Sequence, residues 1–492
     1  MDGGESVDAD LAPHPNLPAA WAAIWSSEPD RPVIHDPHEG WMDGGTLDTR
    51  SRTVAGRYAA VDLRPGDRVL ISCATSIDLV VAHVAALRSG LVVLPTNTAY
   101  RAAELAHLVH DASPKLAIVD DEERAGWLTD ADANLLVTNP AVDLPDGEVP
   151  VLDTMAPDDP AMIGYTSGTT GAPKGAVLSH GNLVASVEAL RLAWRWTAQD
   201  RLVLCLPLFH MHGLGVGLHG TLTAGASAVL LAGFDVDGVL DAADEHDASL
   251  FFGVPTMYNR LVDSPRAAEL AELRLCVSGS APLPAALHTR FEAASGQRVL
   301  ERYGMTETVM LVSNPYDGER RPGSVGFPLP GVELRLDPGT SEVLVRGPNV
   351  FGGYWNRPEA NAEAFGDDGF FRTGDIGSID EDGYLSLVGR AKELVISGGY
   401  NVYPREIEDA LRRYPTVIDA AVTGTPDDEW GEVVTAWLEV ERAIDTDEVA
   451  SFVGDQLAGF KRPRIIHVVD QLPRNALGKV QKHLLGAAEE SR

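Results

Sequence analysis

Tyr165-Thr166-Ser167-Gly168-Thr169-Thr170-Gly171-Ala172-Pro173-Lys174-Gly175 is the most informative stretch of this sequence. It lies between two apolar runs, 161–163 and 176–178, each of which predicts a strand. Its glycines let the backbone turn freely, and its hydroxyl and N–H groups are donors for phosphate oxygens. It is not a Walker A loop, because Lys174 is followed by glycine and a strand rather than by Ser or Thr and a helix. The stretch therefore predicts a phosphate-binding loop between two strands.

This stretch resembles the phosphate-loop signature of the adenylate-forming enzymes, which include acyl-CoA synthetases, luciferases and peptide-synthetase adenylation domains. Further resemblances extend over most of the chain, from about residue 50 to residue 485. The resemblance implies activation of a carboxylic acid with ATP and Mg²⁺, followed by transfer to coenzyme A. It implies ATP contacts at Thr166, Ser167, Gly168, Thr169, Thr170, Gly171 and Lys174, of which Lys174 and Thr169 also serve catalysis.

Composition excludes several classes of function. A chain of 492 residues is too long for one core, so two or more domains are expected. The formal net charge of -33 repels nucleic acid and anionic membranes, and it requires local basic residues where ATP and CoA bind. A high-salt cytoplasm, which screens self-repulsion, would explain this charge. No apolar run is long enough for a membrane span, and no signal segment opens the chain, so we expect a cytoplasmic protein, a monomer or weak homodimer.

The three cysteines are predicted to be structural. Cys73, Cys205 and Cys276 each lie in an apolar run that reads as a strand, which is typical of a small buried hydrophobe. Their spacing matches no metal site. A reducing compartment is consistent with free thiols.

The order of elements predicts an α/β fold. From Thr53 onward, strands alternate with helices, which indicates parallel or mixed sheets flanked by helices, and several candidate site segments follow strand ends. Residues 1–50 are expected to be irregular, and residues 323–387 to form a small β-rich part. The boundary is placed at Gly389-Arg390, giving an N-terminal domain over 1–389 and a small mobile α/β domain over 390–492 that ends in a helix from Val480.

A second signature of the family, Tyr303-Gly304-Met305-Thr306-Glu307, follows a predicted strand. Charge that develops during attack on the α-phosphorus must be met by Mg²⁺, lysines and backbone donors. By resemblance, Glu307 is a catalytic residue and magnesium ligand, with Thr169 or Thr306 as supplementary oxygens. The resemblance also implies an adenine and ATP site formed by Gly279, Ser280, Ala281, Glu301, Tyr303, Gly304, Met305 and Thr306.

Further resemblances lie toward the C-terminus. Asp375, in Arg372-Thr373-Gly374-Asp375, and Arg390 match family residues that contact ribose or phosphate. Lys392 occupies the family's hinge position. The resemblance implies that Lys479, in 473–479, is the catalytic lysine, bridging the substrate carboxylate and the α-phosphate. It implies coenzyme A contacts at Ser397, Gly398, Gly399 and Tyr400.

Arg302 suggests which acid is activated. Fatty-acid and aryl-acid enzymes of this family usually carry a small or neutral residue there, whereas a buried arginine needs an anion, and its planar fork suits a second substrate carboxylate. The alternative is a pair with Glu301 or another protein carboxylate. The acyl pocket is expected to include His210, Ser280, Arg302 and Met305; His212 is a weaker candidate, and either histidine could instead belong to the core.

Three motifs, at residues 208–213, 252–258 and 301–308, together resemble malonyl-CoA synthetases, which act on malonate and sometimes methylmalonate. One departure is the apolar segment 309–312, which leaves room for a larger or more apolar acid. We therefore predict a dicarboxylate–CoA ligase. The alternatives are an aryl- or medium-chain acyl-CoA ligase, an adenylation enzyme that loads a carrier protein, and a nucleotide-binding module that has lost activity.

Overall fold

The computed structural model describes residues 10–166, 173–397, 400–427, 430–475 and 478–485. Its contacts divide the chain into two compact units. The first contains residues Met1–Glu333 and Val345–Phe371, and the second contains Leu334–Leu344 and Arg372–Arg492. The predicted boundary at Gly389-Arg390 concerns movement of the small domain, and it stays a prediction.

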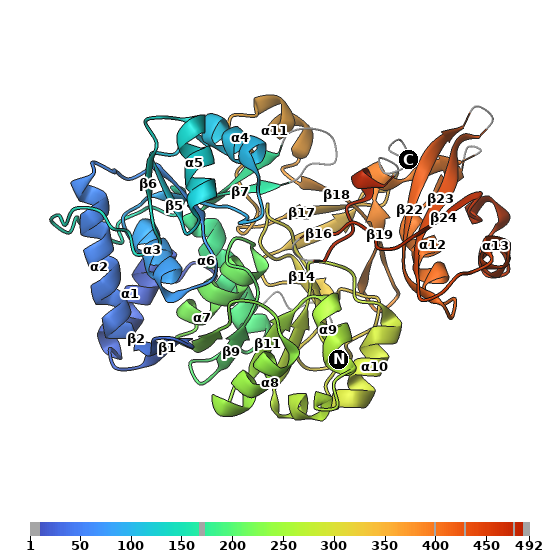
Figure 1. Cartoon of the computed structure of the whole chain (residues 1–492), viewed down its shortest axis with the longest axis horizontal. Coiled ribbons are helices and arrows are strands. Elements are labelled where there is room, and N and C mark those ends of the chain that lie inside the picture. The colour runs from blue at the N-terminus through green and yellow to red at the C-terminus, as the bar shows by residue number, and fades with distance from the viewer. Residues whose placement is uncertain (1–9, 167–172, 398–399, 428–429, 476–477, 486–492) are drawn as a thin grey trace. The chain divides into compact units, whose positions relative to one another are not determined.

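The first unit contains a six-stranded sheet in the order β6-β5-β3-β4-β7-β8. All neighbouring strands are parallel except β7 and β8, which are antiparallel. Helices accompany this sheet, as the alternating pattern predicts (Figure 1). The strands are β3 (Arg68–Ser72), β4 (Val92–Pro95), β5 (Leu116–Val119), β6 (Leu136–Thr138), β7 (Pro160–Thr166) and β8 (Lys174–Ser179), and the helices are α2 (Gly44–Ala60), α3 (Ile77–Arg88), α4 (Ala102–Ala112) and α5 (Glu122–Ala131).

A nine-stranded sheet in the order β15-β14-β13-β12-β11-β9-β10-β1-β2 forms the rest of this unit. Its central strands, from β13 to β1, are parallel, so their carboxyl ends meet at one edge. The strands are β1 (Pro32–Asp36), β2 (Gly40–Asp43), β9 (Arg201–Leu204), β10 (Ser227–Leu230), β11 (Leu250–Gly253), β12 (Leu275–Ser278), β13 (Leu300–Tyr303), β14 (Val312–Ser313) and β15 (Phe327–Pro328). The helices are α1 (Leu17–Ser27), α6 (His180–Ala193), the π-helix η1 (His212–Leu218), α7 (His219–Thr223), α8 (Val236–Glu245), α9 (Pro255–Val262), the 3₁₀ helix η2 (Ala267–Glu272), α10 (Ala285–Ser295) and α11 (Pro358–Ala364).

The N-terminal region corrects one expectation, because residues 17–50 are ordered in α1, β1, β2 and the start of α2. The Asn16 side chain caps α1 by accepting a hydrogen bond from the Ala19 N–H at 2.7 Å. The Leu17 and Trp21 side chains are fully buried, and the Trp21 indole donates to Thr223 in α7. Burial of these large side chains against distant elements orders a segment whose local pattern is weak.

The second unit contains a four-stranded sheet of β16 (Glu333–Leu336), β17 (Glu342–Arg346), β18 (Phe371–Ile379) and β19 (Leu385–Arg390), together with an α/β domain. That domain contains β20 (Val395–Ser397), β21 (Tyr400–Val402), β22 (Val417–Asp427), β23 (Gly431–Val440) and β24 (Ile465–Val469), with α12 (Pro404–Leu411), α13 (Thr446–Gly454) and the 3₁₀ turns η3 (Ala391–Glu393), η4 (Gly459–Lys461) and η5 (Lys482–Leu484). The expected helix from Val480 is wrong for the described residues, where a short 3₁₀ turn takes its place.

The three cysteines are buried and free, as predicted. Cys205 and Cys276 belong to a core that includes Phe251 and Phe291, on one face of the nine-stranded sheet. None of the helices among the described residues combines the length and the apolarity that a membrane crossing requires.

Candidate active site

Strands β7 and β8 frame the phosphate-loop stretch. They are antiparallel, and Thr166 at the end of β7 is the register partner of Lys174 at the start of β8. The prediction of a connection between two strands, rather than a strand and a helix, is confirmed. The predicted ATP contacts Ser167, Gly168, Thr169, Thr170 and Gly171 lie outside the described residues.

An anchor that the sequence analysis missed holds the end of β7. The Tyr165 hydroxyl donates to Asp111 Oδ2 at 2.8 Å, and Arg357 Nη2 donates to Asp111 Oδ1 at 2.5 Å. The Trp355 indole donates to the backbone carbonyl of the same aspartate at 3.1 Å. A carboxylate at the end of α4 thus ties the first residue of the phosphate-loop stretch to the segment 354–357.

Tyr354 brings the predicted catalytic residues Lys174 and Glu307 together. The Lys174 ammonium lies 5.3 Å from the centre of the Tyr354 ring, and the Tyr354 hydroxyl donates to Glu307 Oε1 at 3.0 Å. Tyr354 is held in place because the backbone of 353–355 pairs with β8, including a bond from the Trp355 N–H to Gly175 O at 2.7 Å. The aromatic and glycine-rich run 351–355 could have drawn attention to Tyr354 in the sequence. Its contacts with β8 and Glu307 could not be predicted, because these partners are far away in the chain.

Glu307 suits the magnesium ion that the family resemblance implies. Its side chain is buried and its Oε1 accepts the bond from Tyr354, while its backbone carbonyl accepts a bond from the Phe351 N–H at 2.8 Å, so both the carboxylate and the backbone are held. Mg²⁺ commonly binds through one or two carboxylates and substrate phosphates while it keeps several waters. One buried carboxylate beside a phosphate loop therefore fits this ion, whereas Thr169 lies outside the described residues. Thr306 packs against β7, since a Cβ added at Gly164 would lie 2.4 Å from its methyl group.

The predicted adenine segment follows β12. Ser280 has a positive φ of 68°, which a residue other than glycine rarely adopts and which marks a constrained turn. Glu301 contacts the chain just after this turn: its side chain is buried, and its Oε1 accepts a hydrogen bond from the Leu283 N–H at 2.9 Å. Tyr303 ends β13 and is buried, and Gly304 lets the chain pass the Val309 carbonyl, which would lie 2.3 Å from an added Cβ. Gly279, Ala281 and Met305 lie in the connections that follow β12 and β13.

Arg302 is a buried cation, and in the described part of the chain no ion pair involves it. Its side chain is only 5% exposed, and Nε and Nη2 have no hydrogen-bond partner among the described residues. Burial lowers the pKa of Arg302 to about 9, so the guanidinium is still charged at neutral pH. It lies directly over Gly279, where an added Cβ would be 2.2 Å from the guanidinium carbon. The alternative of a pair with Glu301 receives no support from these contacts.

His212 is a buried histidine near Arg302. Its Nδ1 lies 3.2 Å from the Ser280 hydroxyl, and its backbone N–H donates to His210 Nδ1 at 3.2 Å. Burial, and then repulsion by Arg302, holds the pKa of His212 well below its usual value, so the ring is neutral. The structure thus adds His212 to the predicted group of His210, Ser280 and Arg302.

The apolar segment 309–312 is buried throughout. Val309 has a positive φ of 54°, and its side chain lies against Gly215 in the π-helix, 3.1 Å from an added Cβ. The apolar side chains of this segment are therefore packed in the protein interior, next to the turn of 304–309.

In the second unit, Asp375 of β18 and Arg390 of β19 are register partners, with Arg390 Nε 3.0 Å from Asp375 Oδ1. Gly374 has a φ of +72°, and its N–H donates to Glu342 Oε1 at 3.0 Å, which fixes the turn before the buried aspartate. The backbone of Lys392 lies in η3, directly after this strand. Ser397 is buried at the end of β20 and Tyr400 begins β21, whereas Gly398 and Gly399 lie outside the described residues.

Lys479 follows a tight turn. Its N–H donates to Asn475 Oδ1 at 2.9 Å, and its carbonyl accepts a bond from the Asn475 N–H at 2.9 Å. The residue keeps an exposed surface, yet desolvation by surrounding atoms, followed by repulsion from Arg390, lowers its pKa against the opposing pull of Glu393 and Asp375. Three residues predicted from separate motifs, Asp375, Arg390 and Lys479, therefore act on one another within the second unit.

Comparison with known proteins agrees with these features. Residues 21–355 match the AMP-binding enzyme family, and residues 406–479 match the AMP-binding enzyme C-terminal domain. The chain is 35% identical over 486 residues to the malonate–CoA ligase of Arabidopsis thaliana, covering 88% of this chain and 80% of that protein. It is 36% identical over 481 residues to a feruloyl-CoA synthase of Amycolatopsis sp, covering 93% of this chain and 97% of that protein.

A solved structure of similar fold is the ATP-bound MatB from Rhodopseudomonas palustris. It matches with a TM-score of 0.90 at 40% identity, and the match covers 96% of this chain and 99% of that one. These matches confirm the predicted α/β fold with a large N-terminal and a small C-terminal domain. The chain belongs to the AMP-binding, adenylate-forming enzymes, and it is an AMP-forming acyl-CoA ligase.

Proposed function

We propose that this enzyme activates a short dicarboxylic acid, malonate or methylmalonate, and joins it to coenzyme A. The observation that carries the proposal is Arg302, a buried guanidinium for which the described residues supply no carboxylate. A buried charge of this kind is stable when an anion meets it, and the planar fork of arginine suits a carboxylate. A second carboxylate on the substrate is the anion that an acyl pocket would provide.

The neighbours of Arg302 support this choice. His212 is neutral, so it does not compete for the anion, and its Nδ1 is held by Ser280. Its Nε2 is buried without a partner among the described residues and is available to the substrate. Gly279 leaves the space that the guanidinium occupies. The apolar segment 309–312 departs from the malonyl-CoA synthetase pattern and would suit a slightly larger or more apolar diacid than malonate, such as methylmalonate.

The proposed reaction has two steps. A substrate carboxylate oxygen attacks the α-phosphorus of ATP, the bond to pyrophosphate breaks, and an acyl adenylate forms. The sulfur of coenzyme A then attacks the acyl carbon, the bond to AMP breaks, and the thiol proton leaves to solvent. We assign Lys479 to the first step, where its charge bridges the attacking carboxylate and the α-phosphate.

The remaining roles follow the same signatures. We propose that Lys174 and the phosphate-loop stretch hold the β- and γ-phosphates, and that Glu307 binds Mg²⁺, which would supply charge to the phosphate oxygens. The Asp375 carboxylate would accept hydrogen bonds from the ribose hydroxyls, while Arg390 holds that carboxylate in place. Ser397 and Tyr400, on either side of residues outside the described part, would contact coenzyme A.

The test replaces Arg302 by methionine, which fills most of its volume and removes its charge. Leaving the distal carboxylate without its partner costs about 3–5 kcal/mol, which is roughly a hundredfold or more. We expect kcat/KM for malonate to fall by that factor, whereas butyrate should be used as well as before or better. The measurement is AMP release with coenzyme A over both acids.

Arg88 provides the matched control. It is also fully buried, but its guanidinium is paired with Asp48 at 2.7 Å and Asp153 at 3.0 Å. Arg88→Met should lower the melting temperature and reduce the activity on both acids together. If Arg302→Met behaves in the same way as Arg88→Met, Arg302 is structural and the proposal of a dicarboxylate substrate is wrong.

A further inference from the structure

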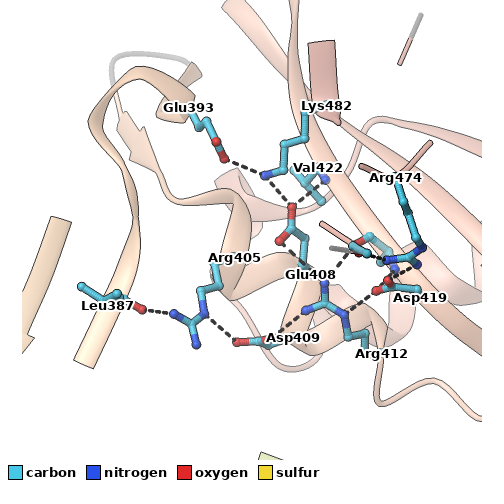
Figure 2. A network of polar contacts seen from close by, with 12 residues as sticks. Leu387, Glu393, Arg405, Glu408, Asp409, Arg412, Asp419, Val422, Arg474 and Lys482 are labelled. Atoms are coloured by element: carbon cyan, nitrogen blue, oxygen red, sulfur yellow. Dashed lines mark hydrogen bonds and ion pairs between the residues drawn. The ribbon is translucent and has the colours of Figure 1, made fainter. Parts of the chain in front are cut away.

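The segment that carries Lys479, residues 473–482 and called here the lysine segment, is attached to the rest of the second unit at both of its ends. Before the turn, Arg474 Nη2 lies 2.5 Å from Asp419 Oδ2 in β22. After the turn, Lys482 Nζ lies 2.7 Å from Glu408 Oε1 in α12 and 3.0 Å from Glu393 Oε2 in η3. Figure 2 shows Arg474 and Lys482 reaching this group of side chains from two sides.

The two attachments are connected through one arginine. Arg412 in α12 joins them, since its Nε lies 2.7 Å from Asp419 Oδ1 and its Nη2 lies 3.9 Å from Glu408 Oε2. Glu408 is held further by a bond from the Val422 N–H at 2.9 Å (Figure 2). The side chains of Glu408 and Asp419 are 9% and 19% exposed, so solvent screens these pairs less than surface pairs.

Within the lysine segment, the backbone has little freedom among the described residues. Arg474 and Val480 form an antiparallel bridge, and the Gln481 N–H donates to Pro473 O at 2.8 Å. Arg474 Nη1 also donates to the Gly478 carbonyl at 3.0 Å, directly before Lys479. The same arginine therefore holds Asp419 with one nitrogen and the turn with another.

We propose that Arg474 and Lys482 are positioning residues for Lys479, which hold the lysine segment in the geometry needed for formation of the acyl adenylate. The proposal rests on the proposed role of Lys479 in that step. Lys482 also reaches Glu393, the residue after the predicted hinge Lys392, so it links the lysine segment to the backbone about which the small domain is expected to turn.

The chemistry of the pairs is suited to such a role. Burial disfavours the charge of Lys482, but Glu408 and Glu393 outweigh it and raise the pKa of this lysine, so the pairs persist over the neutral range. Lys479, in contrast, has a lowered pKa and no carboxylate within hydrogen-bonding distance among the described residues. Lys482 is paired with two protein carboxylates, whereas the Lys479 amine can bind a substrate.

The test is Lys482→Met, which keeps the aliphatic stem and removes the charge. Misplacement of a reacting group by about 1 Å costs up to a hundredfold, so we expect ATP–pyrophosphate exchange with malonate to fall roughly ten- to a hundredfold. Thioester formation from supplied malonyl adenylate, in which Lys479 has no assigned role, should stay within about twofold of wild type. Lys482→Arg should restore exchange, and Arg474→Met should repeat the pattern of Lys482→Met.

Two further variants separate the possible outcomes. Lys479→Ala should abolish exchange, while thioester formation from supplied malonyl adenylate should stay near wild type, because Lys479 is assigned to the first step alone. Lys461→Met is the matched control: it removes a lysine that pairs with Glu406 in the same helix α12, and it should leave exchange unchanged.

Unchanged exchange in Lys482→Met would overturn the positioning role. Equal losses in both half-reactions would also overturn it, because they would show that the ion pairs of Lys482 stabilise the fold rather than position Lys479. Exchange that survives Lys479→Ala would instead overturn the proposed role of Lys479, on which this inference rests.

Discussion

At the scale of single residues, Gly279 and Arg302 depend on each other. The guanidinium occupies the space in which any other residue at 279 would place its Cβ, with 2.2 Å to the guanidinium carbon and 2.3 Å to Nε. Real Cβ contacts of that length do not occur, so a side chain at 279 must displace the arginine or the strand end that carries it. The glycine is needed here for space rather than for its backbone conformation.

Gly279→Ala should therefore act mainly through Arg302. We expect the displaced guanidinium to bind the distal carboxylate poorly, so that kcat/KM for malonate falls by about tenfold or more while butyrate is affected less. Gly233→Ala is the control, since nothing lies within 4 Å of a Cβ added there. Equal activity ratios for malonate and butyrate in wild type and Gly279→Ala would contradict this account.

At the residue level, a sequence can group side chains that belong to one contiguous motif, but it does not reveal long-range contacts. Arg302 and Glu307 stand in one run of eight residues, so the sequence assigns both to one candidate site. Tyr354 and Asp111 could not be found in this way, because their contacts depend on the pairing of 353–355 with β8 and on the position of α4. His212 was ranked below His210, since a sequence does not tell which of two neighbouring rings faces Ser280.

At the scale of elements, strands and helices with strong apolar patterns were predicted well. Helix α3 is buried along its whole length, and its continuous apolar run marks it clearly. Helix α1 was missed because its stability comes from Trp21 packing against α7, 202 residues away, rather than from its own periodicity. The C-terminal helix was expected from the local sequence pattern alone. In the structure, ion pairs with Glu393 and Glu408 hold Lys482 in a short 3₁₀ turn.

The turn η3 allows a test of the predicted hinge. A 3₁₀ turn has φ between about −50° and −70°, which is close to the φ that proline imposes. Lys392→Pro should therefore hold the described conformation, in which Asp375 and Arg390 act on Lys479. We expect one half-reaction, either ATP–pyrophosphate exchange or thioester formation from supplied acyl adenylate, to persist while the other falls strongly, as measured separately for each.

Lys392→Ala removes the same side chain without restricting φ, and it should keep both half-reactions near wild type. Wild-type rates in the proline variant would place the hinge at another residue.

At the scale of the whole molecule, buried neutral histidines should make stability depend on pH. Burial lowers the pKa of His83 to about 3 and that of His180 to about 4. Burial, helped by Arg302 near His212 and by the neighbouring histidines near His219, holds the pKa values of His212 and His219 well below the usual value. His83 and His219 face each other with 2.8 Å between their Nε2 atoms, so one ring donates and the other accepts.

Below pH 6.5, the unfolded chain binds protons at these histidines and the folded chain does not. The free energy of unfolding should therefore decrease as pH falls from 7 to 5, by up to about 1.4 kcal/mol per pH unit for each histidine. Urea unfolding in about 1 M salt, which screens the repulsion of the net charge of -33, is the appropriate measurement. A stability that is constant over this range would show that these rings can be protonated in place.

The contact between Gly279 and Arg302 also constrains the order in which such a pocket can arise in evolution. With alanine at 279, an arginine that arises at 302 would have to take a position other than the one described here, because the two side chains would occupy the same space. The described position of the guanidinium is therefore open from the start only if glycine at 279 precedes arginine at 302. In the reverse direction, a larger residue that enters at 279 while the arginine is present displaces the guanidinium, so activity on the diacid falls before the arginine itself is lost.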